Sequence, residues 1–390
     1  MGKTQRTVAR GDAIQPLTRR AGRVRVHRFR AGESDSELYD RFLALREQIY
    51  GDDYFFYSDA DLHRQLIDYY ARRPDYRFEM LLCEQRDGED IGRVLVGRAG
   101  DLPWTFFGFF ECPRDSTTFS VLMDAALESA YRLGGNTIFG PLDFNSLHAW
   151  MFQLDSEPRE RWGGDRYHRS YYPALFQRAG WRITHESVSG EVRPDRQAQL
   201  MKRFGSFPDQ LRRQGFEFIR RGDLPDDELV HLIWKLVEES FTPDLHRYVS
   251  VDYDFFRAIF RPFLARLSDP FSVSGFLKDG KLAAYGTSFV NYIEDLCNAD
   301  GSKVRPTNVV PEPRRFSAYA TAVAKDRRGS KLFPGLTVIG AQHSQRRYGH
   351  CLTWRRTSVA NPGTASLRAI STVTSRHATF GRPLVQLPSS

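Results

Sequence analysis

Cysteine is scarce in this sequence. Only Cys83, Cys112, Cys297 and Cys351 occur among 390 residues, and no two of them form a CxxC pair. Such wide spacing speaks against a disulfide framework or a zinc site, and the apolar neighbours of each cysteine predict buried free thiols. HExxH, Walker A, GxSxG and GxGxxG motifs are also absent. The sequence therefore gives no support for a metalloprotease, a P-loop NTPase, an α/β-hydrolase or a dinucleotide-binding enzyme, and we expect no metal.

Long apolar runs are missing as well. No stretch approaches the ~20 apolar residues that a transmembrane helix needs, so no membrane association is expected. Residues 1–22 are basic but have no apolar core, which is unlike a secretory signal. We expect these residues to form a disordered tail and the protein to be cytoplasmic.

Apolar and basic residues are well represented. The hydrophobic content of 41% and the aromatic content of 13% suffice for packed cores. At about 150 residues per domain, the length predicts two or three domains. Lys and Arg number 56 against 48 Asp and Glu, a formal charge of +8. This excess favours phosphate-bearing partners such as nucleotides, CoA, acyl carriers or RNA, although a solvated basic surface explains it equally well.

Hydrophobic periodicity predicts one order of elements twice along the chain. In the first half we expect strands at 24–29, 78–83, 92–97, 105–110, 136–139 and 181–192, and helices at 34–50, 58–73, 116–133 and 171–179. In the second half we expect strands at 216–220, 271–277, 281–292, 317–324 and 352–357, helices at 227–240, 253–267, 332–348 and 364–375, and a polar loop around 297–315. The repetition, split near 195–210, predicts α+β domains over 23–200 and 201–390.

A basic glycine loop lies between a strand and a helix of the second half. Val323 and Ala324 close the strand, and the loop reads Arg327-Arg328-Gly329-Ser330-Lys331 before a helix begins at Leu332. Backbone N–H groups of such a loop and the positive end of the following helix can hold an anion. An ordinary charged turn is the alternative.

The loop and two other segments resemble the GNAT (Gcn5-related N-acetyltransferase) superfamily, present twice. Residues 138–146 and 171–181 look like the GP-x-x-x-S and YYP-x-x-F-x-x-x-GF segments of a bacterial tandem-GNAT family. The resemblance covers residues 24–380 and implies two GNAT-like α+β domains in tandem. It also implies that the CoA of acetyl-CoA or another acyl-CoA binds at Val323, Ala324, Arg327, Arg328, Gly329, Ser330, Lys331 and Leu332.

The sequence departs from the superfamily at several points. Lys331 stands where a second small residue is usual, and it either crowds the phosphates or binds them. The corresponding segment of the first half, 113–118, contains no glycine, and Asp115 or Ser116 is a helix cap there. We therefore expect a degenerate N-terminal copy and donor binding in the C-terminal copy. Asn361 is implied to hydrogen-bond the pantetheine arm, but it also makes a turn with the proline and glycine that follow it.

Proton transfer has only weak candidates. No tyrosine follows Tyr348, so the tyrosine acid that is usual in the superfamily is absent. Either Ser366 or Ser371 substitutes for it, or no acid is needed. The base that accepts the amine proton is Glu294 or Asp295, unless these are merely charges at a strand end.

Six residues are candidates for binding the acceptor. Each has an aromatic ring or a positive charge and is expected near a cleft between the two halves. They are Tyr167, Arg169, Tyr171, Tyr172, Tyr248 and Tyr285. The first four could equally form a wall of domain packing.

Together these features favour an acyltransferase that moves an acyl group from acyl-CoA, or from an acyl carrier protein, to an amine. The acceptor would be a small molecule or an amino acid, in specialised metabolism. One alternative is an aminoacyl-tRNA-dependent transferase, for which the arginine surplus suits RNA phosphates. Another is a non-catalytic ligand-binding protein. The sequence leaves a monomer and a homodimer both open.

Overall fold

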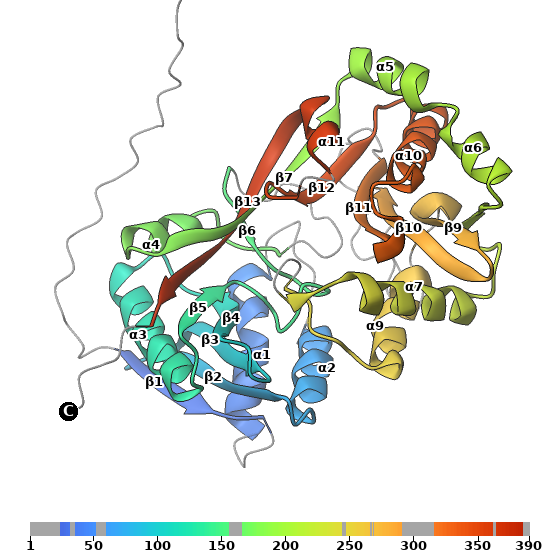
Figure 1. Cartoon of the computed structure of the whole chain (residues 1–390). Helices are drawn as coiled ribbons and strands as arrows, with labels where there is room; N and C mark the ends of the chain where they lie inside the picture. Colours follow the sequence, from blue (N-terminus) through green and yellow to red (C-terminus); the bar gives the residue numbers. More distant parts are fainter. Residues whose placement is uncertain are drawn as a thin grey trace, which may run out of the picture.

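The computed structural model (Figure 1) describes residues 24–31, 36–51, 60–155, 166–243, 247–265, 267, 269–290, 316–361 and 364–384. The expected tail at 1–22 and the expected loop at 297–315 lie outside these residues. None of the helices in the described ranges has the length and apolar content that crossing a bilayer requires.

The N-terminal half begins with a strand and two helices, followed by a three-stranded antiparallel unit. Its elements are β1 (Val24–Phe29), α1 (Ser36–Tyr50), α2 (Ala60–Ala71), β2 (Tyr76–Gln85), β3 (Asp90–Ala99), β4 (Trp104–Glu111), α3 (Ser116–Arg132), β5 (Thr137–Gly140), β6 (Phe152–Gln153), α4 (Tyr172–Arg178) and β7 (Arg182–Val192).

The C-terminal half repeats this order after two connecting helices. Its elements are α5 (Pro194–Phe204), α6 (Phe207–Arg213), β8 (Glu217–Arg220), α7 (Asp226–Ser240), α9 (Tyr253–Ala265), η1 (Pro270–Ser272), β9 (Val273–Lys278), β10 (Lys281–Val290), β11 (Phe316–Val323), η3 (Lys325–Arg327), α10 (Leu332–Tyr348), β12 (Thr353–Ser358), α11 (Ala365–Ala369) and β13 (Ser371–Pro383). The predicted internal repeat is confirmed.

All strands but β6 form one continuous path of hydrogen-bonded neighbours. The order is β1-β2-β3-β4-β5-β13-β7-β12-β11-β10-β9-β8. The strands β1 to β5 of the first half correspond to β8 to β12 of the second, and β13 corresponds to β7. The order is therefore the same from either end of the sheet. At the centre, the last strand of each half is exchanged. β13 lies between β5 and β7, with Phe380 opposite Gly140, and β7 lies between β13 and β12, with Glu191 opposite Thr353. Each half therefore depends on a strand from the other to complete its sheet.

Helices cover both faces of the sheet, and one core joins the halves. Buried residues of α2 and β2 pack in the same hydrophobic cluster as those of α7 and α9. At this contact the rings of Tyr69 and Phe255 stack with centroids 3.4 Å apart, and the Tyr69 hydroxyl donates to Asp252 at 2.5 Å. Burying a large apolar side chain contributes about 1.5–3 kcal/mol, so this shared core holds the halves together. On the other face, α3 and α4 cover the N-terminal half, and α10 with α5 and α6 covers the C-terminal half.

One secondary-structure prediction was wrong. The helix predicted at 364–375 ends at Ala369, and residues 371–383 form β13 instead. The Thr, Val and Phe residues of this segment favour a strand, and pairing with both β5 and β7 fixes it as one. The region at 195–210, near which the division between the halves was predicted, holds α5 and most of α6, the two helices that connect the halves. Pro194 and Pro208 stand in their first turns, where a proline is tolerated because its missing N–H would have no helical partner.

Three of the four cysteines confirm the prediction of buried free thiols. Cys83, Cys112 and Cys351 are buried and unpaired, and burial raises the pKa of the Cys83 thiol to about 12. Cys297 lies outside the described residues.

Candidate functional site: the donor loop and the two sheet openings

The basic glycine loop at residues 327–331, named the donor loop here after its predicted role, joins β11 to α10 through a tight turn. Gly329 has φ of 77°, in the region that favours glycine, and a Cβ built there would meet no atom within 4 Å. The Ser330 hydroxyl accepts a hydrogen bond from the backbone N–H of Leu332 at 3.3 Å. Pro334 removes one N–H from the first turn of α10, so the Leu332 and Phe333 amides are the donors left there. No carboxylate caps this helix.

Two cations of the loop are directed to neighbouring helices. The Arg328 guanidinium donates to the carbonyl of Ser240 at the end of α7, at 2.8 Å. The Lys331 ammonium donates to the Gln210 side chain of α6 at 2.5 Å and lies over the ring of Phe207. The Lys331 side chain, whose size raised the question of crowding, is thus held against α6.

The sheet opens beside this loop. β11 and β12 are parallel and pair only at Ser317 with Thr353 and Ala318 with Trp354, although β11 continues to Val323. The chain that leaves β12 follows β7, because the Val359 N–H donates to the Glu186 carbonyl at 3.0 Å. Among the described residues, no segment pairs with β11 on this side beyond Ala318. We call this space the C-terminal opening.

The equivalent space in the N-terminal half is filled by the chain itself. β4 and β5 pair only as far as Phe106 with Phe139. The segment after β5 then turns back into the space, where the Leu142 N–H donates to the Phe107 carbonyl at 2.8 Å. A Cβ at Gly108 would lie 2.3 Å from the Leu142 oxygen, so glycine is required for this close approach. We call this space the N-terminal opening.

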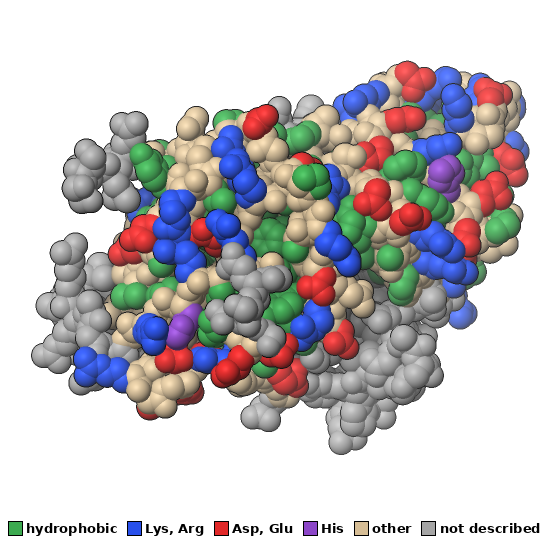
Figure 2. All heavy atoms as spheres, turned by 90° about the horizontal axis from the view of Figure 1, so that it is seen from below, with side chains coloured by type: hydrophobic (Ala, Val, Ile, Leu, Met, Phe, Trp, Pro, Cys, Tyr) green, Lys and Arg blue, Asp and Glu red, His purple; other side chains and the backbone are tan. Residues whose placement is uncertain are grey.

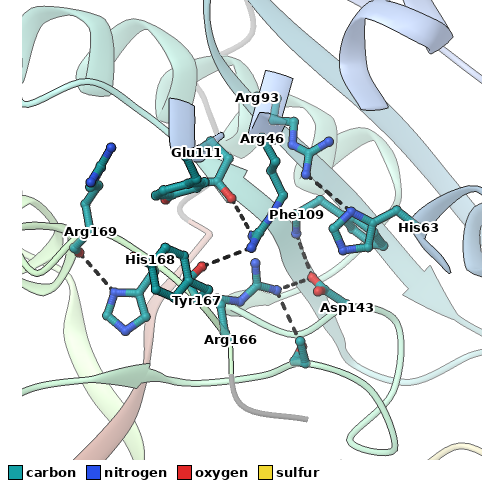
Figure 3. A network of polar contacts seen from close by, with 12 residues as sticks. Arg46, His63, Arg93, Phe109, Glu111, Asp143, Arg166, Tyr167, His168 and Arg169 are labelled. Atoms are coloured by element: carbon teal, nitrogen blue, oxygen red, sulfur yellow. Dashed lines mark hydrogen bonds and ion pairs between the residues drawn. The ribbon is translucent and has the colours of Figure 1, made fainter. Parts of the chain in front are cut away.

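A buried ion pair locks the filling segment in place. The Asp143 carboxylate accepts a hydrogen bond from the Phe109 N–H at 2.7 Å and pairs with Arg166, whose side chain is 1% exposed (Figure 3). The Arg166 guanidinium also approaches the Ala149 carbonyl. A buried charge requires a partner of this kind, because removal from water is costly.

The helix that follows β4 already carries an anion at its start. Asp115 accepts hydrogen bonds from the backbone N–H groups of Thr117 and Thr118, at 3.2 and 2.7 Å, as predicted for a helix cap. Burial raises the pKa of Asp115, but the hydrogen bonds from Thr118 and Thr117 outweigh it and leave the pKa below its usual value. The carboxylate thus occupies the amides that a phosphate would use, whereas the start of α10 has no such group.

Four predicted acceptor-binding residues lie near Glu111, at the end of β4, and Figure 3 shows two of them, Tyr167 and Arg169. Glu111 is fully buried and accepts from Arg46 at 2.7 Å and from the Tyr172 hydroxyl at 2.8 Å. Tyr172 has no exposed surface. The Tyr167 carbonyl accepts from Arg46 at 3.2 Å, and the Arg169 guanidinium donates to the Ile49 carbonyl. The Tyr171 hydroxyl donates to the Cys112 carbonyl at 2.9 Å. These contacts agree with the alternative interpretation, in which the four residues form a wall of domain packing.

The other two candidates lie in the C-terminal half. Tyr248 and Tyr285 belong to the core shared by the halves and are 2% and 4% exposed. The Tyr248 hydroxyl donates to Glu238, and burial, followed by this hydrogen bond, raises the Tyr248 pKa far above its usual range. The structure therefore brings the six candidates together in two separate groups.

The sequence did not point to a polar cluster where the halves meet at the C-terminal opening. Arg356 of β12 donates to the Tyr319 hydroxyl of β11 and to the Trp150 carbonyl of the N-terminal half, the latter at 3.1 Å. The Trp150 ring also lies 5.5 Å from the ring of His185 on β7. Burial, and then the charge of Arg247, lower the pKa of His185 to about 4, so its imidazole is neutral at pH 7. No local motif marks these residues, because they come from four distant segments.

The remaining predicted residues are placed as follows. Asn361 closes a turn after β12, with its N–H bonded to the Ser358 carbonyl at 3.1 Å. Ser366 lies in α11 and Ser371 at the start of β13, where the Ser371 hydroxyl donates to the Leu367 carbonyl. Glu294 and Asp295 lie outside the described residues, so their role stays a prediction. In the described part of the chain, no cluster of three metal-binding side chains occurs.

Comparison with known proteins gives a clear result only for structure. No protein-family model matches the sequence, and no curated protein is significantly similar to it. A tandem GNAT protein from the clavulanic acid biosynthesis pathway matches 94% of this chain and 100% of its own, with a TM-score of 0.51 and 13% identity. A probable N-acyltransferase from Enterococcus faecalis matches 93% of this chain and 73% of its own, with a TM-score of 0.52 and 11% identity. With the repeated element order and the single mixed sheet, these likenesses show that the chain has the tandem GNAT fold, with two GNAT-like halves in one polypeptide.

Proposed function

We propose that the protein is an N-acyltransferase that moves an acyl group from an acyl-CoA to the amine of a small molecule, with the donor held by the C-terminal half. The observation that carries this proposal is the contrast between the two openings. The N-terminal opening is filled by residues 141–145 and its helix start is capped by Asp115, whereas neither feature occurs among the described residues of the C-terminal opening.

The C-terminal opening suits an extended thioester arm. The backbone of β11 beyond Ala318 can pair with an amide-bearing chain as with an additional strand, because strand N–H and C=O groups require partners. The diphosphate of the donor would lie against the amides of Leu332 and Phe333 at the positive end of α10.

The chemical step is direct aminolysis. The nitrogen of a neutral amine attacks the thioester carbonyl carbon, the C–N bond forms, the C–S bond breaks, and the thiolate takes up a proton as it leaves. A β11 backbone N–H near Val323 would stabilise the oxyanion that develops on the carbonyl. Glu294 or Asp295 is the proposed acceptor of the amine proton, directly or through water.

The acceptor would enter where the halves meet. There, Trp150, Tyr319 and Arg356 offer aromatic surface and hydrogen-bonding groups beside the thioester end of the opening. A small amine of specialised metabolism is the proposed class, by analogy with the tandem GNAT protein of the clavulanic acid pathway. Basic and acidic side chains are interspersed on the face seen in Figure 2, so this face offers no continuous basic track for RNA.

The test is donor binding, measured by calorimetry with acetyl-CoA, octanoyl-CoA and bulk tRNA. Ser330→Asp would reproduce the cap of the N-terminal half. Asp115 binds the amides two and three residues after it, and residue 330 has the same spacing to the amides of residues 332 and 333. We expect this variant to fold normally and to bind acyl-CoA about tenfold or more weakly, as its carboxylate repels the diphosphate. Ser116→Asp, the same change at the start of α3, is the control and should have no effect.

Equal acyl-CoA affinity in wild type and Ser330→Asp would refute donor binding at this loop. Salt-dependent tRNA binding without acyl-CoA binding would favour the aminoacyl-tRNA-dependent alternative. Binding of neither donor would favour a non-catalytic protein.

A further inference from the structure

A cavity of about 450 Å³ lies between α6, α10 and the strands β8 and β9, at the outer end of the sheet. Its volume is in the range of small-molecule sites. Four phenylalanines dominate its lining: Phe216, Phe218, Phe271 and Phe276. Figure 1 shows α6 and α10 at this end of the molecule, on the far side from the N-terminal half. Neither the donor loop residues from Arg328 to Leu332 nor the C-terminal opening contributes to the lining.

The aromatic walls are fixed by contacts among themselves. The Phe218 ring lies 5.6 Å from that of Phe276 and 6.1 Å from that of Phe271. Phe271 in turn stacks on His343 of α10, with centroids 4.1 Å apart. The His343 imidazole is held by Asp269 at 2.7 Å, so neither this ring nor the Phe271 ring stacked on it can rotate freely. The pocket therefore exists before any ligand arrives and requires little reorganisation.

The polar rim of the cavity carries two arginines, Arg212 and Arg346, and one carboxylate, that of Asp209. Arg346 is exposed and, among the described residues, has neither a hydrogen bond nor an ion pair. Arg212, on the α6 side, pairs only with Asp209 of the same helix at 2.8 Å, and both side chains are mostly exposed. A surface pair of this kind is weak and can exchange for a ligand anion. The cavity thus combines an aromatic interior with one guanidinium, that of Arg346, which is available to a ligand.

We propose that this cavity is a second ligand site, which takes a small aromatic carboxylate. The ring would lie among the phenylalanines in offset or edge-to-face contact, and the carboxylate would reach the fork of Arg346 at the rim. The proposal does not rest on the acyltransferase activity. Arg346 stands fifteen residues beyond Lys331 on α10, which is about 22 Å along the helix axis. One residue of the lining comes near the donor loop, because the Phe216 ring lies 6.0 Å from the Arg327 guanidinium.

The experiment is a titration of the full-length protein with 4-fluorobenzoate, followed by fluorine NMR. We expect saturable binding with a dissociation constant on the order of 1 mM or below, as befits a ligand of about ten heavy atoms. Arg346→Gln should weaken binding about tenfold, the effect of losing one charge-assisted hydrogen bond. Arg347→Gln, the adjacent exposed arginine outside the lining, should leave binding unchanged. The uncharged 4-fluorobenzyl alcohol should bind the wild type about tenfold more weakly than the carboxylate.

Ile339→Trp locates the ligand, because its larger side chain would occupy the cavity. Loss of saturable binding in this variant, with an unchanged circular dichroism spectrum, is the expected result. The proposal fails if the wild type shows no saturable binding, if Arg346→Gln binds as tightly as the wild type, or if Ile339→Trp retains the wild-type affinity. Acyl-CoA affinity plays no part in the readout, so this failure is distinct from that of the proposed function.

Discussion

The backbone N–H of Phe109 donates a hydrogen bond of 2.7 Å to the carboxylate of Asp143, across the N-terminal opening. This bond joins the unpaired end of β4 to the segment that has turned back beside it. The N-terminal half thereby satisfies with its own side chain a strand amide that, in the C-terminal half, we propose to be available to a donor. Together with the Asp115 cap of α3, this carboxylate makes the two copies of the same fold unequal.

Removing that carboxylate should destabilise the protein strongly. Asp143→Ala leaves the buried Arg166 charge without its partner, and breaking a buried ion pair in this way costs about 3–5 kcal/mol. Urea unfolding measures the loss. Asp209→Ala breaks a pair whose side chains are 71% and 61% exposed, and should cost no more than about 1 kcal/mol. Similar losses in both variants would contradict the role given to Asp143.

Deleting β13 should prevent the N-terminal half from folding. A chain that stops after Ile370 lacks the strand between β5 and β7, so both strands expose unpaired edges that favour aggregation. We expect insoluble or unfolded protein, assessed by size-exclusion chromatography and circular dichroism. A chain that stops after Leu384 keeps all of β13 and should behave as the full-length protein. A soluble, folded product from residues 1–200 alone would show that the strand exchange is dispensable.

His148 should make stability depend on pH in the acidic range. Burial lowers the pKa of its imidazole from 6.5 to about 3, and its Nε2 lies 3.1 Å from the Tyr70 hydroxyl. Because the unfolded chain binds a proton near pH 6.5 and the folded one does not, the contribution is complete above pH 6.5. It falls as pH drops from 6.5 towards 3, at about 1.4 kcal/mol per pH unit.

His148→Gln should remove that dependence, since the amide oxygen can replace Nε2 but does not titrate. Between pH 7.5 and pH 5, the wild type should lose about 2 kcal/mol more unfolding free energy than the variant. Urea unfolding at the two pH values gives the difference, and between pH 7.5 and 9 the two proteins should change in parallel. An equal loss below pH 6.5 would mean that His148 is solvated or protonated in the folded state.

A carboxylate base should appear in the pH profile of catalysis. If Glu294 or Asp295 accepts the amine proton, Glu294→Gln or Asp295→Asn lowers kcat/KM about 10²–10⁴-fold and shifts its acidic limb. Rates across pH with the acceptor identified by screening provide the measurement. Two variants with wild-type rate and profile would assign the proton to water or to the substrate.

Much of the fold follows from local sequence. Strands such as β1 and helices such as α10 have the bounds predicted from periodicity, because caps and turn glycines mark them: Asp115 begins α3, and Gly349, with φ of 73°, ends α10. The missing glycine at 113–118 also predicts the unequal copies. Those features depend on neighbours a few residues apart, which the sequence displays directly.

Other features were decided only in three dimensions. β13 is a strand because β5 and β7 lie on either side of it, and no local preference predicts partners more than 170 residues away. Tyr172 looks like a cleft residue in the sequence, yet its hydroxyl is engaged by buried Glu111. Arg356 reaches Trp150 across the junction of the halves without any motif. The sequence by itself determined most of the elements, the repeat and the loop, because these depend on local periodicity and turn chemistry. Tertiary packing decided which strands are exchanged, which opening is filled and which polar groups meet, because these depend on desolvation between segments distant along the chain.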